Sequence, residues 1–229
     1  MPVIINTHQD FSDIKALLGG GDANKNKVNV ISVQEQFKRP KTTMISAISK
    51  DGFIAKDAND KLRWVPKEDQ LWFRKKTIEI GHLIIGKKTF DILPKKALEH
   101  RTYWVYTRKI DKGHVAVLDE NIYLVNMEPA EFLQYLGKKG TKHVAIVGGK
   151  AIYDLFLHSA SLGRNNQKTG LIDEIYLSIV NHTLQTGIKF DLDFVQKHFI
   201  EVKSKDVADS ESRDLGKFEW GERVKYVRK

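Results

Sequence analysis

Two adjacent carboxylates in the stretch WVPKEDQLWF (residues 64–73) are the side chains best suited to do chemistry. If this stretch is a helix, Asp69, Trp72 and Phe73 are spaced i, i+3 and i+4 and share one face, whereas Glu68 is turned by about 100° toward solvent. A carboxylate on an aromatic face is costly unless it is hydrogen-bonded or paired. Asp69 is therefore either a first-turn acid favoured by the helix dipole or a buried carboxylate that recognises a polar heterocycle.

A pair of glycines follows an apolar run in HVAIVGGKAIYDLF (residues 143–156). Without side chains at Gly148 and Gly149, backbone N–H groups at the start of a helix can approach a phosphate. The same pair could equally serve as a tight strand-to-helix turn. The surrounding sequence lacks the Gly-x-Gly-x-x-Gly fingerprint and the Gly-Lys-Ser/Thr phosphate loop, which disfavours an ordinary Rossmann domain or a P-loop NTPase.

Basic residues follow two further apolar runs. HLIIGKKTF places Lys87 and Lys88 after a strand, and WVYTRK places Arg108 and Lys109 after another. Ligands of open α/β sheets bind beyond the carboxyl ends of the strands. Each basic pair alone is typical of solvated surface, but three converging strand ends favour an anionic ligand with more than one phosphate.

The elements that must position these residues alternate along the chain. Apolar runs predict strands at residues 42–49, 82–86, 102–107, 114–118, 122–125, 143–147 and 172–180, and helices at residues 66–77, 87–93, 129–137 and 148–157. Strands that are apolar on both faces and separated by helices indicate an α/β domain with a central mixed, mostly parallel β-sheet and flanking helices. The tail, at residues 199–227, predicts a closing C-terminal antiparallel hairpin.

Residues 1–40 differ from the rest of the chain. They predict a strand at residues 3–5, a short helix at residues 10–18 and a strand at residues 28–34, with no side chains arranged for chemistry. We expect residues 1–40 to be an N-terminal extension of unknown role and residues 41–229 to be one domain.

Composition narrows the class of protein. The 229 residues are 41% hydrophobic and 29% charged, which is typical of a soluble globular protein, and no apolar run is long enough to span a membrane. The absence of cysteine excludes disulfides, zinc–thiolate sites and a cysteine nucleophile, and it fits a cytoplasmic protein without a bound metal. The net charge of +9 fits a lysine-coated surface, a phosphate-rich ligand or, less well, nucleic acid.

The order and spacing of these motifs resemble dihydrofolate reductase from about Thr42 to the C-terminus. ISAISKDGFIAKDANDKLRW resembles the first strand and the mobile loop of that family, ending in Trp64. Asp69 then falls at the spacing of the single active-site carboxylate of the family. LIIGKKTFDIL, HRTYWVYTR, VAIVGGKAIYDLFL and IDEIYLSIV resemble four further segments of the family, in the same order.

The resemblance implies that NADPH donates a hydride to dihydrofolate in the synthesis of tetrahydrofolate for one-carbon metabolism. Asp69 would hold the pterin and promote protonation of its N5, with Ser178 and Trp64 as the other catalytic residues. Arg101 would grip the glutamate carboxylate of folate, and the other substrate contacts would be Ala47, Ile54, Leu62 and Phe73.

For the cofactor, the resemblance implies that Lys87, Thr107 and Arg108 bind the 2′-phosphate and that the Gly148–Gly149 peptide bond is cis. The remaining cofactor contacts would be Ala55, Gly86, Lys88, Thr89, Val147, Gly148, Gly149, Lys150, Ala151, Ile152 and Tyr153.

Several segments depart from the family pattern. Lys150 replaces the third glycine of the turn, the loop before Trp64 is about two residues longer, and GRNNQKTG (residues 163–170) is inserted. The main alternative is a riboflavin-pathway reductase of a ribosylamino-pyrimidine, which shares the fold and NADPH. The spacing of Trp64, Asp69 and Phe73, together with Arg101, favours folate. A non-catalytic basic binding module is the second alternative.

Overall fold

The computed structural model describes residues 38–94, 99–162, 168–203 and 212–229. The strand, helix and strand that the sequence predicts within residues 1–37 lie outside the described residues. The same is true of most of the predicted N-terminal extension and of residues 163–167 of the predicted insertion.

A ten-stranded mixed sheet forms the centre of the domain, in the order β12-β14-β10-β1-β7-β3-β4-β6-β5. Neighbouring strands from β10 to β6 run parallel, whereas β5 pairs antiparallel with β6, and β14 pairs antiparallel with β10, β12 and β13. This arrangement confirms the predicted α/β fold with a mostly parallel sheet. The strands of this sheet are β1 (Lys41–Ser49), β3 (His82–Gly86), β4 (Thr102–Tyr106), β5 (His114–Asp119), β6 (Ile122–Asn126), β7 (His143–Ile146), β10 (Glu174–Val180), β12 (Phe199–Val202), β13 (Gly216–Phe218) and β14 (Gly221–Arg228).

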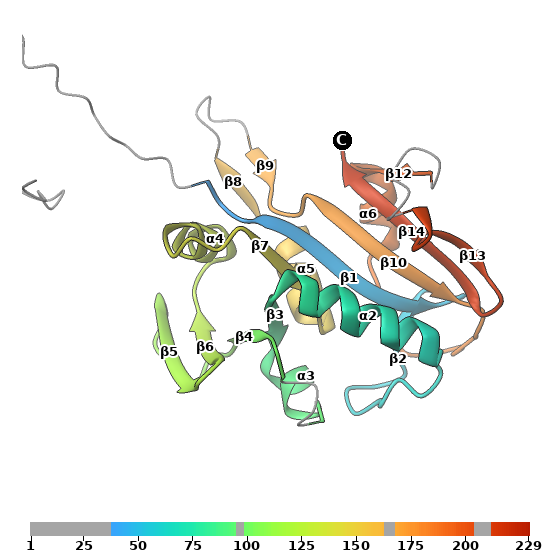
Figure 1. The fold of residues 1–229 in the computed structure, drawn as a ribbon, viewed down its shortest axis with the longest axis horizontal. Coiled ribbons are helices and arrows are strands. Elements are labelled where there is room, and N and C mark those ends of the chain that lie inside the picture. Colours follow the sequence, from blue (N-terminus) through green and yellow to red (C-terminus); the bar gives the residue numbers. More distant parts are fainter. Residues whose placement is uncertain (1–37, 95–98, 163–167, 204–211) are drawn as a thin grey trace, which may run out of the picture. The chain divides into compact units, whose positions relative to one another are not determined.

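Helices cover both faces of the sheet, because successive strand residues point to opposite sides. Ile45 belongs to the apolar cluster that packs with Trp72 and Phe73 of one helix, whereas Met44 belongs to the cluster that contains Phe156. Figure 1 shows α2 in front of the sheet and α5 behind it. The helices are α2 (Lys67–Ile80), α3 (Lys87–Asp91), α4 (Pro129–Lys138), α5 (Lys150–Leu157) and α6 (Leu192–His198).

The longest helix, α2, positions the acids singled out in the sequence. Pro66 precedes its first turn, where a missing N–H is harmless, and Gly81 ends it with a φ of 81°, a conformation that suits glycine. The helix therefore runs three residues beyond the predicted Thr77. Glu68 is exposed and Asp69 is buried, as the helical spacing predicts.

The tail, the loop after β1 and the segment after α5 contain strands that the sequence did not predict. β13 and β14 form a tight hairpin of their own, so that the tail holds three strands rather than two. In the loop after β1, β2 (Phe53–Ala55) pairs with β11 (Ile188–Lys189), which is far away along the chain. β8 (Ala160–Leu162) and β9 (Lys168–Gly170) form another short pair. These strands were missed because runs of two or three residues show no periodicity.

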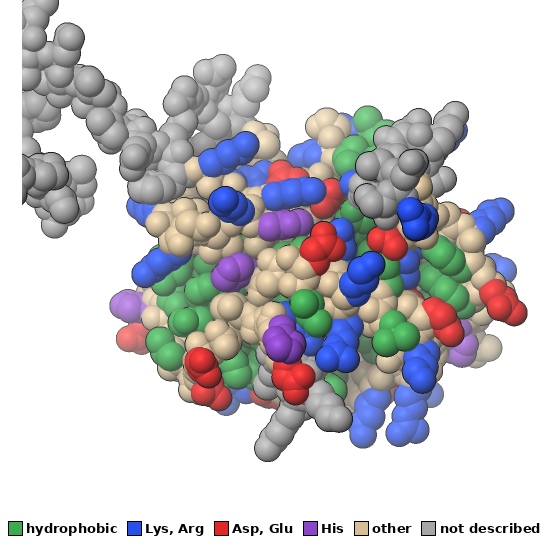
Figure 2. Space-filling view, in the orientation of Figure 1, with side chains coloured by type: hydrophobic (Ala, Val, Ile, Leu, Met, Phe, Trp, Pro, Cys, Tyr) green, Lys and Arg blue, Asp and Glu red, His purple; other side chains and the backbone are tan. Residues whose placement is uncertain are grey.

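The charged surface is mixed. Figure 2 shows Lys and Arg side chains spread over one face of the molecule, with Asp and Glu between them.

In the part of the chain that the structure describes, no helix is long and apolar enough to cross a membrane. Among the same residues, no group of three or more His, Asp or Glu side chains is arranged to hold a metal ion.

Candidate active site

A cavity of about 1200 Å³ lies along the carboxyl ends of the parallel strands. Its wall takes Ala47 from β1, Gly86 from β3, Thr107 after β4, Val147 after β7 and Ser178 from β10. This is the edge at which open α/β sheets bind ligands.

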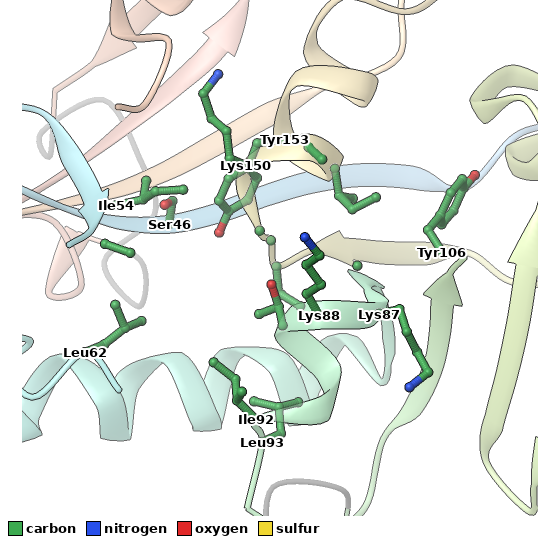
Figure 3. A pocket seen from close by; sticks show the side chains of 18 of the residues that line it. Ser46, Ile54, Leu62, Lys87, Lys88, Ile92, Leu93, Tyr106, Lys150 and Tyr153 are labelled. Carbon is green, nitrogen blue, oxygen red and sulfur yellow. The ribbon is translucent and has the colours of Figure 1, made fainter. Parts of the chain in front are cut away.

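The cavity is elongated. Figure 3 shows Ile54 and Leu62 at one end, Lys87 and Tyr106 at the other, and Lys88 reaching from α3 into the space between. A ligand that filled it would therefore have one end between apolar side chains and the other near basic ones.

Asp69 is the buried acid of the cavity wall. Its side chain comes from the first turn of α2, and the residue is 4% exposed. Ser178 Oγ donates a hydrogen bond to Asp69 Oδ1 over 2.6 Å. The pairing of β1 with β10, which sets Ala47 beside Ser178, carries this hydroxyl to the same edge of the sheet as the glycine turn.

Arg223 also contacts this carboxylate, and no local pattern in the sequence indicated it. Arg223 Nη2 donates to Asp69 Oδ1 over 2.5 Å, and Arg223 Nε donates to Ser178 Oγ over 3.1 Å. Arg223 is 3% exposed and lies opposite Ser178 in the antiparallel pairing of β10 with β14. A buried guanidinium therefore balances the charge of Asp69, which satisfies the need of a buried carboxylate for a partner.

Aromatic rings enclose the guanidinium. Arg223 Cζ lies 3.8 Å from the centre of the Trp72 ring and 5.4 Å from those of Phe218 and Trp220, and its Nη1 donates to the carbonyl of Asp214 over 3.0 Å. Burial lowers the pKa of Arg223, and the hydrogen bond and charge of Asp69 oppose that shift.

Two arginines form a second polar part of the wall. Arg101 is 6% exposed and donates to Thr77 Oγ1 over 3.0 Å, and Arg74 of α2 also lines the cavity. Burial is the main cause of the lowered pKa of Arg101, and the positive charge of Arg74 acts in the same direction. The two side chains together offer a site for a carboxylate.

The glycine turn lies in the middle of the wall. The Gly148–Gly149 peptide bond is cis, as the resemblance implied, and Gly148 O accepts a hydrogen bond from the Gly86 N–H over 2.7 Å. A Cβ added to Gly149 would lie 2.7 Å from Thr89 Oγ1. Tyr153 donates its hydroxyl to Ile45 O over 2.8 Å, which ties α5 to the first strand. The turn thus presents bare backbone to the cavity.

The basic end of the cavity has several charges. Lys87 pairs with Asp91, and Lys150 pairs with Asp154, each one helical turn along. Arg108 follows β4 and lines the cavity as well.

Trp64 stands apart from the other residues predicted for the site. It does not line the cavity. Its Nε1 donates to Asp60 Oδ2 over 3.2 Å, and its ring stacks on His182 with 5.9 Å between ring centres. Asp60 also accepts hydrogen bonds from the backbone N–H groups of Lys56 and Leu62. Trp64 therefore anchors the loop, and all the other predicted site residues reach the cavity wall.

Tyr106 is a further wall residue, which the sequence pattern did not indicate as part of a site. Its hydroxyl is buried and has no hydrogen-bond partner among the residues that the structure describes. Burial is the main cause that raises the pKa of this phenol, and the charge of Glu128 adds to it. The strand 102–107 pointed to this position, but nothing in the sequence distinguished its aromatic residues from core.

Comparison with known proteins places these features in a family. The family model described as dihydrofolate reductase matches residues 41–220. A dihydrofolate reductase of Ureaplasma parvum serovar 3 is 33% identical over 112 residues, which are 49% of this chain and 65% of that protein. The chain thus spans just under two thirds of that relative.

Two solved structures share the fold. The bifunctional diaminohydroxyphosphoribosylaminopyrimidine deaminase and 5-amino-6-(5-phosphoribosylamino)uracil reductase of Thermotoga maritima has a TM-score of 0.59 at 15% identity, covering 85% of this chain and 58% of that one. The dihydrofolate reductase of Enterococcus faecalis, complexed with NADP(H) and RAB-propyl, has a TM-score of 0.54 at 22% identity, covering 82% of this chain and 96% of that one. The family match extends over most of the chain and includes the cavity residues from β1 to β10, and so the chain belongs to the dihydrofolate reductase family.

Proposed function

We propose that the protein is an NADPH-dependent oxidoreductase that reduces 7,8-dihydrofolate to tetrahydrofolate. The observation that carries this proposal is a buried carboxylate, Asp69, on the wall of a long cavity whose other end is basic. Membership of the dihydrofolate reductase family supports it.

Asp69 would hold the pterin ring. Its Oδ1 accepts the hydrogen bonds of Ser178 and Arg223, whereas its Oδ2 accepts none from the described residues. We assign Oδ2 to the flat N–H edge of the pterin, since a carboxylate oxygen is a strong acceptor for such donors. In this arrangement Asp69 orients the ring and promotes protonation of N5.

Apolar side chains would enclose the ring. Ile54, Leu62 and Phe73 line the cavity, and Ala47 brings its backbone to the same place. These side chains would exclude water and hold the ring in a reactive orientation. The loop that Trp64 and Asp60 hold together would close over it.

Arg101 would bind the glutamate carboxylate, assisted by the charge of Arg74. We expect Arg101→Met to raise KM for dihydrofolate by about tenfold or more with little change in the KM for NADPH, because a charged hydrogen bond contributes about 1.5–3 kcal/mol. Steady-state kinetics with each substrate varied in turn would measure this. Equal increases in both KM values would contradict the assignment.

NADPH fits the rest of the cavity. The bare backbone of Gly148 and Gly149 at the start of α5 suits a diphosphate, and Lys87, Thr107 and Arg108 suit the 2′-phosphate. The Enterococcus faecalis relative is complexed with NADP(H), which supports this choice. When bound, NADPH would supply the hydride, and the protein would align the two rings and promote protonation of the pterin N5.

The test is oxidation of NADPH, followed by absorbance, with two acceptors in parallel. We expect oxidation with dihydrofolate. Oxidation with a ribosylamino-pyrimidine alone would instead establish the activity named for the Thermotoga maritima neighbour. If neither acceptor is bound and neither supports oxidation of NADPH, the result would favour the alternative of a non-catalytic basic binding module.

A further inference from the structure

The carboxylate at the pterin end of the cavity is already half of an ion pair. Asp69 and Arg223 are 4% and 3% exposed, and the Nη2 of Arg223 lies 2.5 Å from Oδ1. Ser178 donates to the same oxygen, so both protein hydrogen bonds converge on Oδ1. The cavity wall therefore offers a carboxylate oxygen without offering a full uncompensated negative charge.

The cation of this pair is held firmly and stays outside the main cavity. Arg223 is not part of the wall of that cavity, but it lines an adjoining cavity of about 550 Å³. Trp72, Phe218 and Trp220 surround its guanidinium. A guanidinium stays protonated in proteins, and its planar fork fixes the carboxylate that it binds.

The charges around Arg223 come from several elements. Asp69 lies on α2, and Asp214 precedes β13. Glu68, Arg213 and Glu219 surround the adjoining cavity. Of these charged residues, only Asp69 lines the main cavity, so Arg223 acts on a bound ring through its ion pair with Asp69 and through its own positive charge.

We propose that Arg223 is a specificity-determining positioning residue, which makes Asp69 recognise neutral heterocycles by hydrogen bonding and reduces its preference for rings that are already protonated and cationic when they bind. This inference rests on the proposed function, because it concerns the ring that Asp69 binds. A lone buried carboxylate would gain a complete ion pair from a cationic ring. Asp69 gains less, because Arg223 already neutralises it and repels a second cation.

The test compares two flat probes of similar shape: 2,4-diaminopteridine, at a pH where it is protonated, and 2-amino-4-oxopteridine, which is neutral. Both are titrated into the full chain, and quenching of tryptophan fluorescence gives each Kd. We expect Arg223→Met to raise the preference for the cationic probe over the neutral one by on the order of tenfold to a hundredfold. Because the two ratios are compared, differences between the probes in their own hydrogen bonding cancel.

The matched control is Lys225→Met. Lys225 is a buried cation two residues further along β14, and it pairs with Glu174 rather than Asp69. This variant should keep the wild-type preference. Arg223→Lys, which retains the charge without the fork, should keep most of the discrimination. An unchanged preference in folded Arg223→Met, or an equal change in Lys225→Met, would overturn the proposal.

The wild type alone provides a test that needs no variant to fold. Its affinity for 2,4-diaminopteridine should rise by no more than about tenfold between a pH at which the probe is neutral and one at which it is protonated. A larger rise would contradict the inference. If the wild type binds both probes with this weak preference but does not reduce dihydrofolate, the proposed function fails and the inference about Arg223 stands. If it reduces dihydrofolate and strongly prefers the cation, only the inference fails.

Discussion

Asp69→Asn should lower stability because Arg223 loses its counter-ion, and it should lower turnover because the carboxylate is lost. A second substitution at Arg223 allows the two effects to be measured separately. Asparagine has nearly the same shape, and its Oδ1 can still accept the hydrogen bond from Ser178. It has no charge, however, and Arg223 at 3% exposure would lose its counter-ion. Breaking a buried pair on one side costs about 3–5 kcal/mol.

We expect the lower end of that range, a loss of about 3 kcal/mol in the free energy of unfolding, because Asp214 also stabilises the charge of Arg223. The assay is urea denaturation followed by circular dichroism, with the slope of the transition checked for change. Turnover of dihydrofolate should fall on the order of a hundredfold or more, as for loss of a group that assists proton transfer.

The double variant Asp69→Asn/Arg223→Met separates the two effects. Replacing Arg223, which has lost its counter-ion, should restore most of the lost stability. The coupling free energy between the two substitutions should therefore be about 2 kcal/mol or more. Turnover should stay low, because the carboxylate is still absent. Strictly additive stability changes, or turnover that recovers with stability, would refute the reasoning.

Three further outcomes follow from individual contacts. The hydrogen bond from Ser49, with three backbone N–H groups, lowers the pKa of Asp51 from 3.8 to about 2. A lowered carboxyl pKa gives stability that is present above pH 3.8 and lost as the pH falls through about 2, so Asp51→Asn should flatten the acid part of the stability curve in that window. Tyr106→Phe should raise the free energy of unfolding by about 1 kcal/mol, measured in urea, because it removes a buried hydroxyl without a partner among the described residues; a loss of stability would show that the hydroxyl is satisfied. Gly149→Ala should weaken NADPH binding by about tenfold, measured by fluorescence titration, because its Cβ would lie 2.7 Å from Thr89 Oγ1; unchanged affinity would remove the turn from the cofactor site.

Local periodicity predicted the parts of the site that lie within one element. Asp69 faces inward and Glu68 outward because a helix turns by about 100° per residue. The glycine turn and the basic strand ends meet at one edge because parallel strands share the direction of their carboxyl ends. The register between distant strands has no such local signal. Arg223 reaches Asp69 only because β14 pairs with β10 so that Arg223 lies opposite Ser178, and GERVKYV reads equally well as a strand in any register.

The buried pair also bears on why this chain has an arginine at position 223. Replacing a buried ion pair by apolar side chains of similar volume is often neutral or stabilising, so stability alone is a weak reason for Arg223. The three aromatic rings around the guanidinium could also enclose the apolar side chain of a methionine. If Arg223→Met/Asp69→Asn proves as stable as the wild type, the pair is not needed for folding. The function of Arg223 would then be to compensate the negative charge of Asp69. The choice between neutral and cationic rings is the property that this compensation controls most directly.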